Sequence, residues 1–164
     1  MQSGGEKRWF HDRTILTIYV AILLLGTAYG VTTAIISLFF SSRGIGDENV
    51  GRLASLFALG IGVAAVPAGV LVRKRGGKFV LLVALVTFSL CLVAIPWLNG
   101  FPQLAGTRVL DGASSAAAWV ACETLLLARA PRSQKARVMS IYAVCFAVGY
   151  VIGPALARVV VPLY

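Results

Sequence analysis

The chain alternates between long apolar runs and short polar or charged segments. Five apolar runs cover about residues 15–40, 53–72, 79–98, 104–128 and 138–161. Each run is long enough for a helix to cross a hydrocarbon core of about 30 Å. The pattern therefore predicts an all-α membrane protein with five transmembrane helices. Residues 1–14 are expected to form a tail, and residues 15–162 a helical bundle.

The cations predict how the helices are oriented. They gather before the first run, between the second and third, and between the fourth and fifth: Lys7, Arg8 and Arg13; Arg73, Lys74, Arg75 and Lys78; Arg129, Arg132, Lys135 and Arg137. Short loops rich in Lys and Arg stay in the cytoplasm. The N-terminal tail is therefore expected in the cytoplasm, and residues 69–78 are expected to form a glycine-broken cytoplasmic loop. The first run is too long for the apolar part of a cleaved signal peptide, so it is interpreted as a retained span.

Composition narrows the function class. Apolar residues make up 59% of the chain and charged residues 13%, which excludes an ordinary soluble domain. The net charge of +9 lies in short loops beside apolar runs, so it indicates membrane orientation rather than nucleic-acid binding. The three cysteines lack metal-ligand spacing, and neither a Gly-x-Ser-x-Gly turn nor a phosphate-binding loop is present. We therefore expect no metal, no cofactor and no enzymatic activity.

The fourth run carries ionisable residues among small and apolar ones. Arg108 and Asp111 are three residues apart, so they share a helix face and lie close enough to pair. Glu123 follows fifteen residues after Arg108 and is rotated from it by only about 60°. Ionisable groups inside a membrane usually face a protein interior or a wet cavity. The alternative is a purely structural Arg108–Asp111 pair, with Glu123 reaching toward the cytoplasmic cations.

Small and hydroxyl residues mark the first and fifth runs. The first run carries several threonines, whose hydroxyls either face a cavity or bond the carbonyls of their own helix. The fifth run carries Gly149, Gly153 and Pro154. The glycines thin one face for a neighbouring helix, and proline tends to kink a helix. Whether this segment moves or only packs stays open.

Three short motifs follow one another along the chain: Gly69, Leu71, Lys74, Gly76 and Lys78; Arg108 and Gly112; and Gly149, Gly153 and Pro154. Their order and spacing resemble the N-terminal half of a major facilitator superfamily transporter. The family's motif between spans two and three, G-x-L-x-D-R-x-G-R-[RK], is matched by Gly69, Leu71, Gly76 and Lys78, with Lys74 replacing the first arginine conservatively. The span-four pattern R-x-x-x-G is matched by Arg108 and Gly112, and the span-five pattern G-x-x-x-G-P by Gly149, Gly153 and Pro154. The chain departs from the family at Arg73, where the family has an aspartate that helps hold the outward-facing state. It departs again at Gly77, Ala157 and Arg158.

The resemblance implies a secondary active transporter that moves a small organic solute, such as a drug-like compound, sugar or metabolite, by alternating access. It implies that Tyr29 and Thr33 line the cavity and that Arg108 and Asp111 form a charged element in it. Proton coupling through Glu123 is a hypothesis.

The family has two six-span halves, so the chain is expected to lack a sixth span and a second half. Its expected partners are the lipid bilayer, the solute, and a C-terminal half or second copy. A bacterial inner membrane is the expected location. The alternative is a non-transporting assembly or regulatory subunit.

Overall fold

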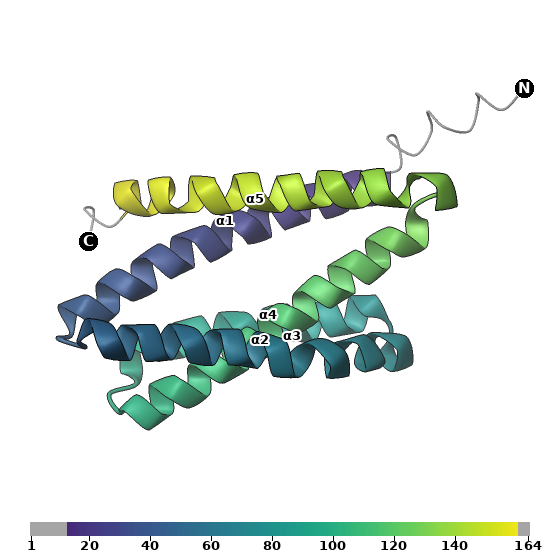
Figure 1. Cartoon of the computed structure of the whole chain (residues 1–164). Coiled ribbons are helices and arrows are strands. Elements are labelled where there is room, and N and C mark those ends of the chain that lie inside the picture. Colours follow the sequence, from purple (N-terminus) through teal and green to yellow (C-terminus); the bar gives the residue numbers. More distant parts are fainter. Residues whose placement is uncertain (1–12, 161–164) are drawn as a thin grey trace, which may run out of the picture. The chain divides into compact units, whose positions relative to one another are not determined.

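The computed structural model describes residues 13–160, and within that range the chain is helical throughout except for short connections. The α-helices are α1 (Arg13–Ser42), α2 (Asp47–Arg75), α3 (Gly77–Ala94), α4 (Phe101–Arg129) and α5 (Lys135–Val160) (Figure 1). Short 3₁₀ turns, η2 (Ile95–Trp97) and η3 (Arg132–Gln134), follow α3 and precede α5. No strand occurs among these residues, which confirms the all-α prediction. Most of the expected tail lies outside the described residues.

Four of the helical segments are long and apolar enough to cross a membrane. They are Ile15–Ser42, Asp47–Arg75, Gly77–Trp97 and Arg132–Val159. Helix α4 has 29 residues and is thus about 43 Å long, but its apolar sequence is interrupted by charged and small polar residues. That α4 crosses the membrane therefore stays a prediction. The other four segments support the conclusion that the chain is a membrane protein.

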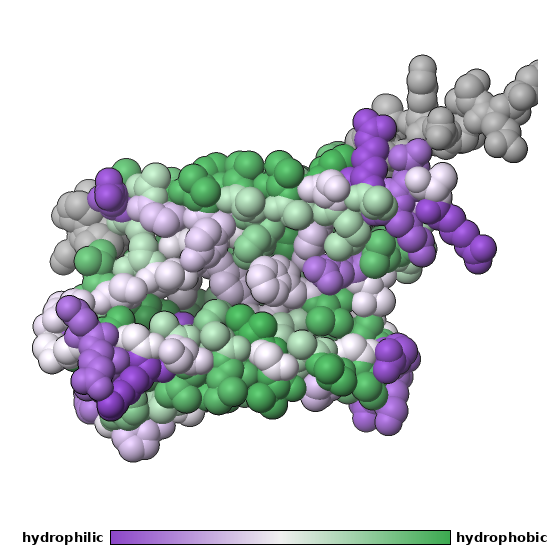
Figure 2. Space-filling view, in the orientation of Figure 1, coloured by the Kyte–Doolittle hydropathy of each residue, from purple (hydrophilic) through white to green (hydrophobic). Residues whose placement is uncertain are grey.

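The chain divides into two compact units, which are described separately. Of the described residues, unit 1 holds 13–44 and 126–160, and unit 2 holds 45–125. In the view of Figure 2, strongly hydrophilic residues gather at the ends of the helices, and hydrophobic residues and residues of intermediate hydropathy cover the lengths between them. This distribution is expected of transmembrane helices, whose central parts contact hydrocarbon and whose ends contact headgroups and water.

In unit 1, α1 packs along α5 through small residues. A Cβ added to Gly153 would lie 2.5 Å from the Cα of Gly30, so the two backbones nearly touch there. Gly26 and Gly149 meet the backbone of the opposite helix in the same way. At the start of α5, the Tyr19 hydroxyl donates a hydrogen bond to the carbonyl oxygen of Val138 at 3.2 Å. Close approach of this kind is how helices associate where both their surroundings and their surfaces are apolar.

In unit 2, α2 and α4 cross at a second pair of glycines. A Cβ on Gly60 would lie 3.1 Å from the amide nitrogen of Ala113, and one on Gly112 would lie 3.1 Å from that of Ile61. Each would also collide with a carbonyl of the opposite helix. Further along these helices, Val72 and Val80 pack with the buried Ala121 and tie α2 and α3 to α4.

The predicted cytoplasmic loop at residues 69–78 is wrong in its extent. Helix α2 continues to Arg75 and α3 begins at Gly77, so only Gly76 lies between them. Lys and Arg are good helix formers, and a helix that emerges from lipid can continue where its charged side chains are solvated. Gly76 ends α2 because its φ of 85° and ψ of 146° suit glycine alone, and its N–H donates to the carbonyl oxygen of Val72.

Helix α3 leaves one apolar face uncovered. The exposed side chains include Leu82, Leu90 and Val93, and Trp97 in the following η2 turn is exposed as well. An apolar surface of this kind would be unfavourable in water and suits contact with lipid.

Candidate functional site

The candidate site centres on an ion pair within α4. Arg108 donates through Nη1 to Oδ2 of Asp111. The side chains are only 11% and 1% exposed, respectively. Because the residues are three apart on one helix, the helix itself brings the two groups together. Removing two charges from water is costly, so a pair this deeply buried requires further contacts from the surrounding residues to offset the lost solvation.

An aromatic ring from α2 covers the guanidinium of Arg108. Its carbon Cζ lies 4.4 Å from the centroid of the Phe57 ring, which is the geometry of a cation–π contact. The carbonyl of Phe57 is also the group against which Gly112 packs. The close crossing of α2 and α4 therefore places the ring beside Arg108.

The carboxylate of Asp111 is only partly satisfied. Its Oδ1 is buried and has no hydrogen-bond partner among residues 13–160. The hydroxyls of Ser114 and Ser115 donate instead to the main-chain carbonyl of Asp111, at 2.8 and 2.7 Å. An unpaired buried acceptor is costly, so Oδ1 is a position where a proton or a donor group of a bound molecule would be stabilised.

Glu123 lies apart from this pair. It is half-buried in α4 and twelve residues beyond Asp111, about 18 Å along the helix axis. The structure therefore brings Arg108 and Asp111 together and leaves Glu123 at a different depth of the same helix.

The candidate residues of α1 belong to unit 1, whereas the α4 pair belongs to unit 2. Tyr29 is half-buried and meets the ring of Phe146 edge-on, with 6.0 Å between centroids. Thr33 is exposed. The nearby Thr27 hydroxyl donates to the carbonyl oxygen of Leu23 at 2.9 Å. This threonine therefore bonds a carbonyl of its own helix, which was one of the two roles considered for the threonines of the first run.

Sequence reasoning missed Phe57 and Gly60. Neither residue stands out in an apolar run, because their importance comes from a helix about fifty residues later in the chain. Ser114 and Ser115 were also missed, although two adjacent hydroxyls directly after Asp111 were a visible signal. Within the described part of the chain, no three potential metal ligands lie together.

Comparison with known proteins identifies the family. A family model of the Major Facilitator Superfamily matches residues 18–164. The chain belongs to the Major Facilitator Superfamily. It is 23% identical over 145 residues to the quinolone resistance protein NorA of Staphylococcus aureus, covering 88% of this chain and 37% of that protein. It is also 23% identical over 143 residues to an uncharacterized MFS-type transporter of Enterobacter sp. (strain 638), covering 87% and 37%. The chain thus spans 37% of the length of these relatives.

The superfamily motif at the α2–α3 junction is spread over two helices. Arg73 and Lys74 are exposed in the last turn of α2, and Lys78 is exposed in the first turn of α3. Gly76 makes the break between them, while Gly69 lies within α2 with nothing near its Cβ position. The motif therefore presents its cations at one end of unit 2.

The other superfamily glycines are packing residues in this structure. Gly112 lies in the α2–α4 crossing, and Gly149 and Gly153 lie in the α1–α5 crossing. Pro154 lies inside α5 without interrupting it, and a Cβ on Gly30 would lie 3.0 Å from its Cδ. Packing is thus a role that these residues have, whether or not α5 also moves.

Proposed function

We propose that the chain forms part of a secondary active transporter that moves a small, drug-like organic solute by alternating access. Membership of the superfamily and a relative named for quinolone resistance support this class of function. The observation that carries the proposal is the buried Arg108–Asp111 pair with an unpaired carboxylate oxygen. Ionisable groups inside a membrane protein mark substrate and ion pathways more often than they mark packing.

The pair would act as an exchangeable contact. A ligand shifts a conformational equilibrium only if it binds one state better than the other. Protonation of Asp111, or a cationic group of the solute at Oδ1, would weaken the hold on Arg108 and free the guanidinium for another partner. Tyr29 and Thr33 would contribute an aromatic ring and a hydroxyl from α1, and Glu123 would carry a second proton at its own depth.

The motif residues would serve the same movement. Gly112, Gly149 and Gly153 allow close backbone contact within their helix pairs, which would let each pair move as a rigid body. The cations Arg73, Lys74 and Lys78 would anchor their end of unit 2 at the cytoplasmic membrane surface. We propose that the chain acts with a second helical half, either from a C-terminal segment or from another copy.

Flux measurements on the complete native polypeptide in proteoliposomes test the proposal. Arg108→Ala should abolish uptake of a fluorescent drug, while Asp111→Asn and Glu123→Gln should weaken flux driven by a pH gradient. Asp47→Asn, which changes an exposed acid in the first turn of α2, is the matched control and should leave flux unchanged. Unchanged flux in both acid variants would sink proton coupling, and normal flux in Arg108→Ala would remove that residue from the path. If no compound is moved and a distinct protein partner co-purifies, the chain is an assembly or regulatory subunit.

The membrane orientation has its own test. We propose a cytoplasmic N-terminus in a bacterial inner membrane, with α1 running outward. In intact cells, an impermeant maleimide should label Ser42→Cys and spare Lys78→Cys. The reverse pattern would invert the orientation without affecting the transport proposal.

A further inference from the structure

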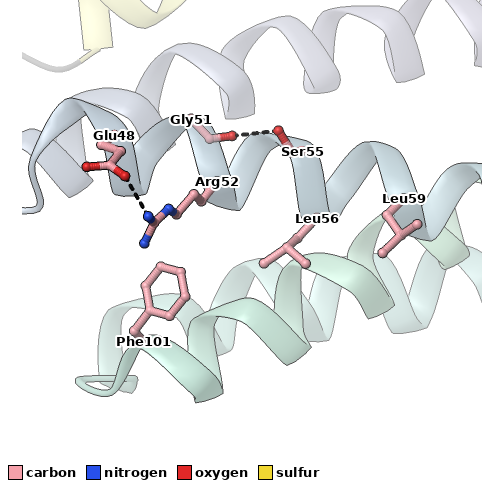
Figure 3. Close-up of a pocket in the computed structure, with 7 residues that line it drawn as sticks. All are labelled: Glu48, Gly51, Arg52, Ser55, Leu56, Leu59 and Phe101. Carbon is pink, nitrogen blue, oxygen red and sulfur yellow. Dashed lines mark hydrogen bonds and ion pairs between the residues drawn. The ribbon is translucent and has the colours of Figure 1, made fainter.

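A groove opens where the first turns of α2 lie beside the start of α4, entirely within unit 2 (Figure 3). Its volume of about 730 Å³ falls in the range of small-molecule sites, roughly 300–1,000 Å³. The lining residues are Glu48, Gly51, Arg52, Ser55, Leu56, Leu59 and Phe101. None of them belongs to the α4 pair described above.

The groove has a charged end and an apolar length. Glu48 Oε1 and Arg52 Nη2 form an ion pair at 2.5 Å, with side chains 79% and 61% exposed. Further along α2, Leu56 and Leu59 project on the same side, and Phe101 points from α4 toward Arg52 (Figure 3). These α2 residues follow at steps of three and four, so they line one face of the helix.

This order of groups matches the depth profile of a bilayer. Helix α2 has 29 residues and is about 43 Å long, which exceeds the hydrocarbon core by about 13 Å. Charged side chains are costly in hydrocarbon, and α2 carries them at both ends, so its first turns would reach the headgroup level. Leu56 and Leu59 lie about 6 Å and 10 Å further along the axis than Arg52, on the hydrocarbon side.

We propose that this groove binds a zwitterionic phospholipid with a primary ammonium headgroup, such as phosphatidylethanolamine. Arg52 would donate to the phosphate, because its guanidinium has five N–H donors and only some are used by Glu48 and by Asn49, at 3.5 Å. Glu48 would accept from the ammonium through its other oxygen. One acyl chain would lie along Leu56, Leu59 and Phe101.

The charges select this class over other lipids. A purely anionic headgroup gains from Arg52 but is repelled by the adjacent carboxylate of Glu48. A choline headgroup carries a positive charge but has no N–H to donate. Only a headgroup with a phosphate and a protonated amine satisfies both partners. The inference does not depend on the proposed transport, since it concerns a different surface and a different ligand.

Native mass spectrometry of the complete native polypeptide tests it. The protein is reconstituted in vesicles with equal amounts of phosphatidylethanolamine, phosphatidylglycerol and phosphatidylcholine, and the lipids retained after gentle extraction are counted. Phosphatidylethanolamine should be enriched about three- to fivefold over both others, which is the effect on binding expected of one exposed ion pair. Glu48→Gln should abolish its preference over phosphatidylglycerol, and Arg52→Gln should reduce retention of all three.

Matched controls use charges of the same helix that lie outside the groove. Asp47→Asn and Arg75→Gln should retain the wild-type lipid pattern, as both residues are exposed and neither lines the groove. Equal retention of the three lipids, or a preference for phosphatidylglycerol, would overturn the proposal. A photo-crosslinker placed at Leu59 should capture lipid. Capture of another helix of the protein would mean that the groove is a protein contact, and would overturn it as well.

Discussion

The crossing of α2 and α4 can be tested by adding single methyl groups. Each helix offers a glycine in the crossing and a glycine in open space: Gly60 and Gly62 in α2, Gly112 and Gly106 in α4. A Cβ at Gly62 or Gly106 would meet nothing within 4 Å. Alanine substitutions at these four positions therefore separate the crowding of the crossing from the general effect of replacing glycine.

The expected magnitudes follow from two opposing effects. Alanine is favoured over glycine in a helix interior by about 1 kcal/mol, and this gain applies at all four positions. Inserting a methyl group into a packed contact costs about 1–3 kcal/mol. The neighbours of Gly60 and Gly112 are backbone atoms, which cannot rotate away as a side chain can. Within each helix, the crossing variant should therefore be about 1–3 kcal/mol less stable than the open variant.

Thermal unfolding of the purified chain in detergent gives the measurement. Cys91 and Cys122 are buried, so a thiol-reactive dye reports their exposure, in a background where the half-buried Cys145 is replaced by serine. A gap of about 1–3 kcal/mol corresponds to roughly 2–12 °C in Tm. The double variant Gly60→Ala with Gly112→Ala should lose less than the two single losses added together, because both methyls separate the same helices. Equal Tm values for Gly112→Ala and Gly106→Ala would refute the close crossing.

Three further changes should alter stability in the same assay. Asp111→Asn should destabilise by about 3–5 kcal/mol because it removes the carboxylate that pairs with the buried guanidinium of Arg108, and replacing both residues by leucine should cost clearly less; an equal cost would argue against a mutual pair. Tyr19→Phe should lose about 0.5–1.5 kcal/mol through its hydrogen bond to Val138, whereas an unchanged Tm would mean that the bond does not contribute. Gly76→Ala should cost about 1–3 kcal/mol because alanine is strained at a φ of 85°, and a wild-type Tm would contradict that backbone conformation.

Long apolar runs predicted the helices well. In lipid no water is available to bond the backbone N–H and C=O groups, so an apolar segment has to form a helix that satisfies them internally. Residues 15–40 became Arg13–Ser42, and residues 138–161 became Lys135–Val160. The ends were underestimated where polar residues extend a helix beyond its apolar core. At residues 69–78 the same cause turned an expected loop into two helix ends separated by Gly76. Charge predicts where a chain leaves lipid, but it does not predict where a helix stops.

The candidate site was only partly accessible from the sequence. Arg108 and Asp111 could be paired because both lie on one helix, and their separation fixes their relative position. Phe57 and Gly60 could not be found, since contacts between helices depend on how the helices cross. Conversely, Gly112, Gly149 and Gly153 were recognised as motif residues, and the structure adds the backbone contacts that make glycine necessary there.

The single residue between α2 and α3 limits how these helices can move. An extended residue spans at most about 3.6 Å, so the two helix ends have almost no slack. If α2 tilts or slides, α3 has to follow and carry its uncovered apolar face through the surrounding lipid. The resistance of the bilayer to that displacement becomes part of the energy of any α2 movement, so membrane thickness and fluidity would act directly on the conformational equilibrium of this unit.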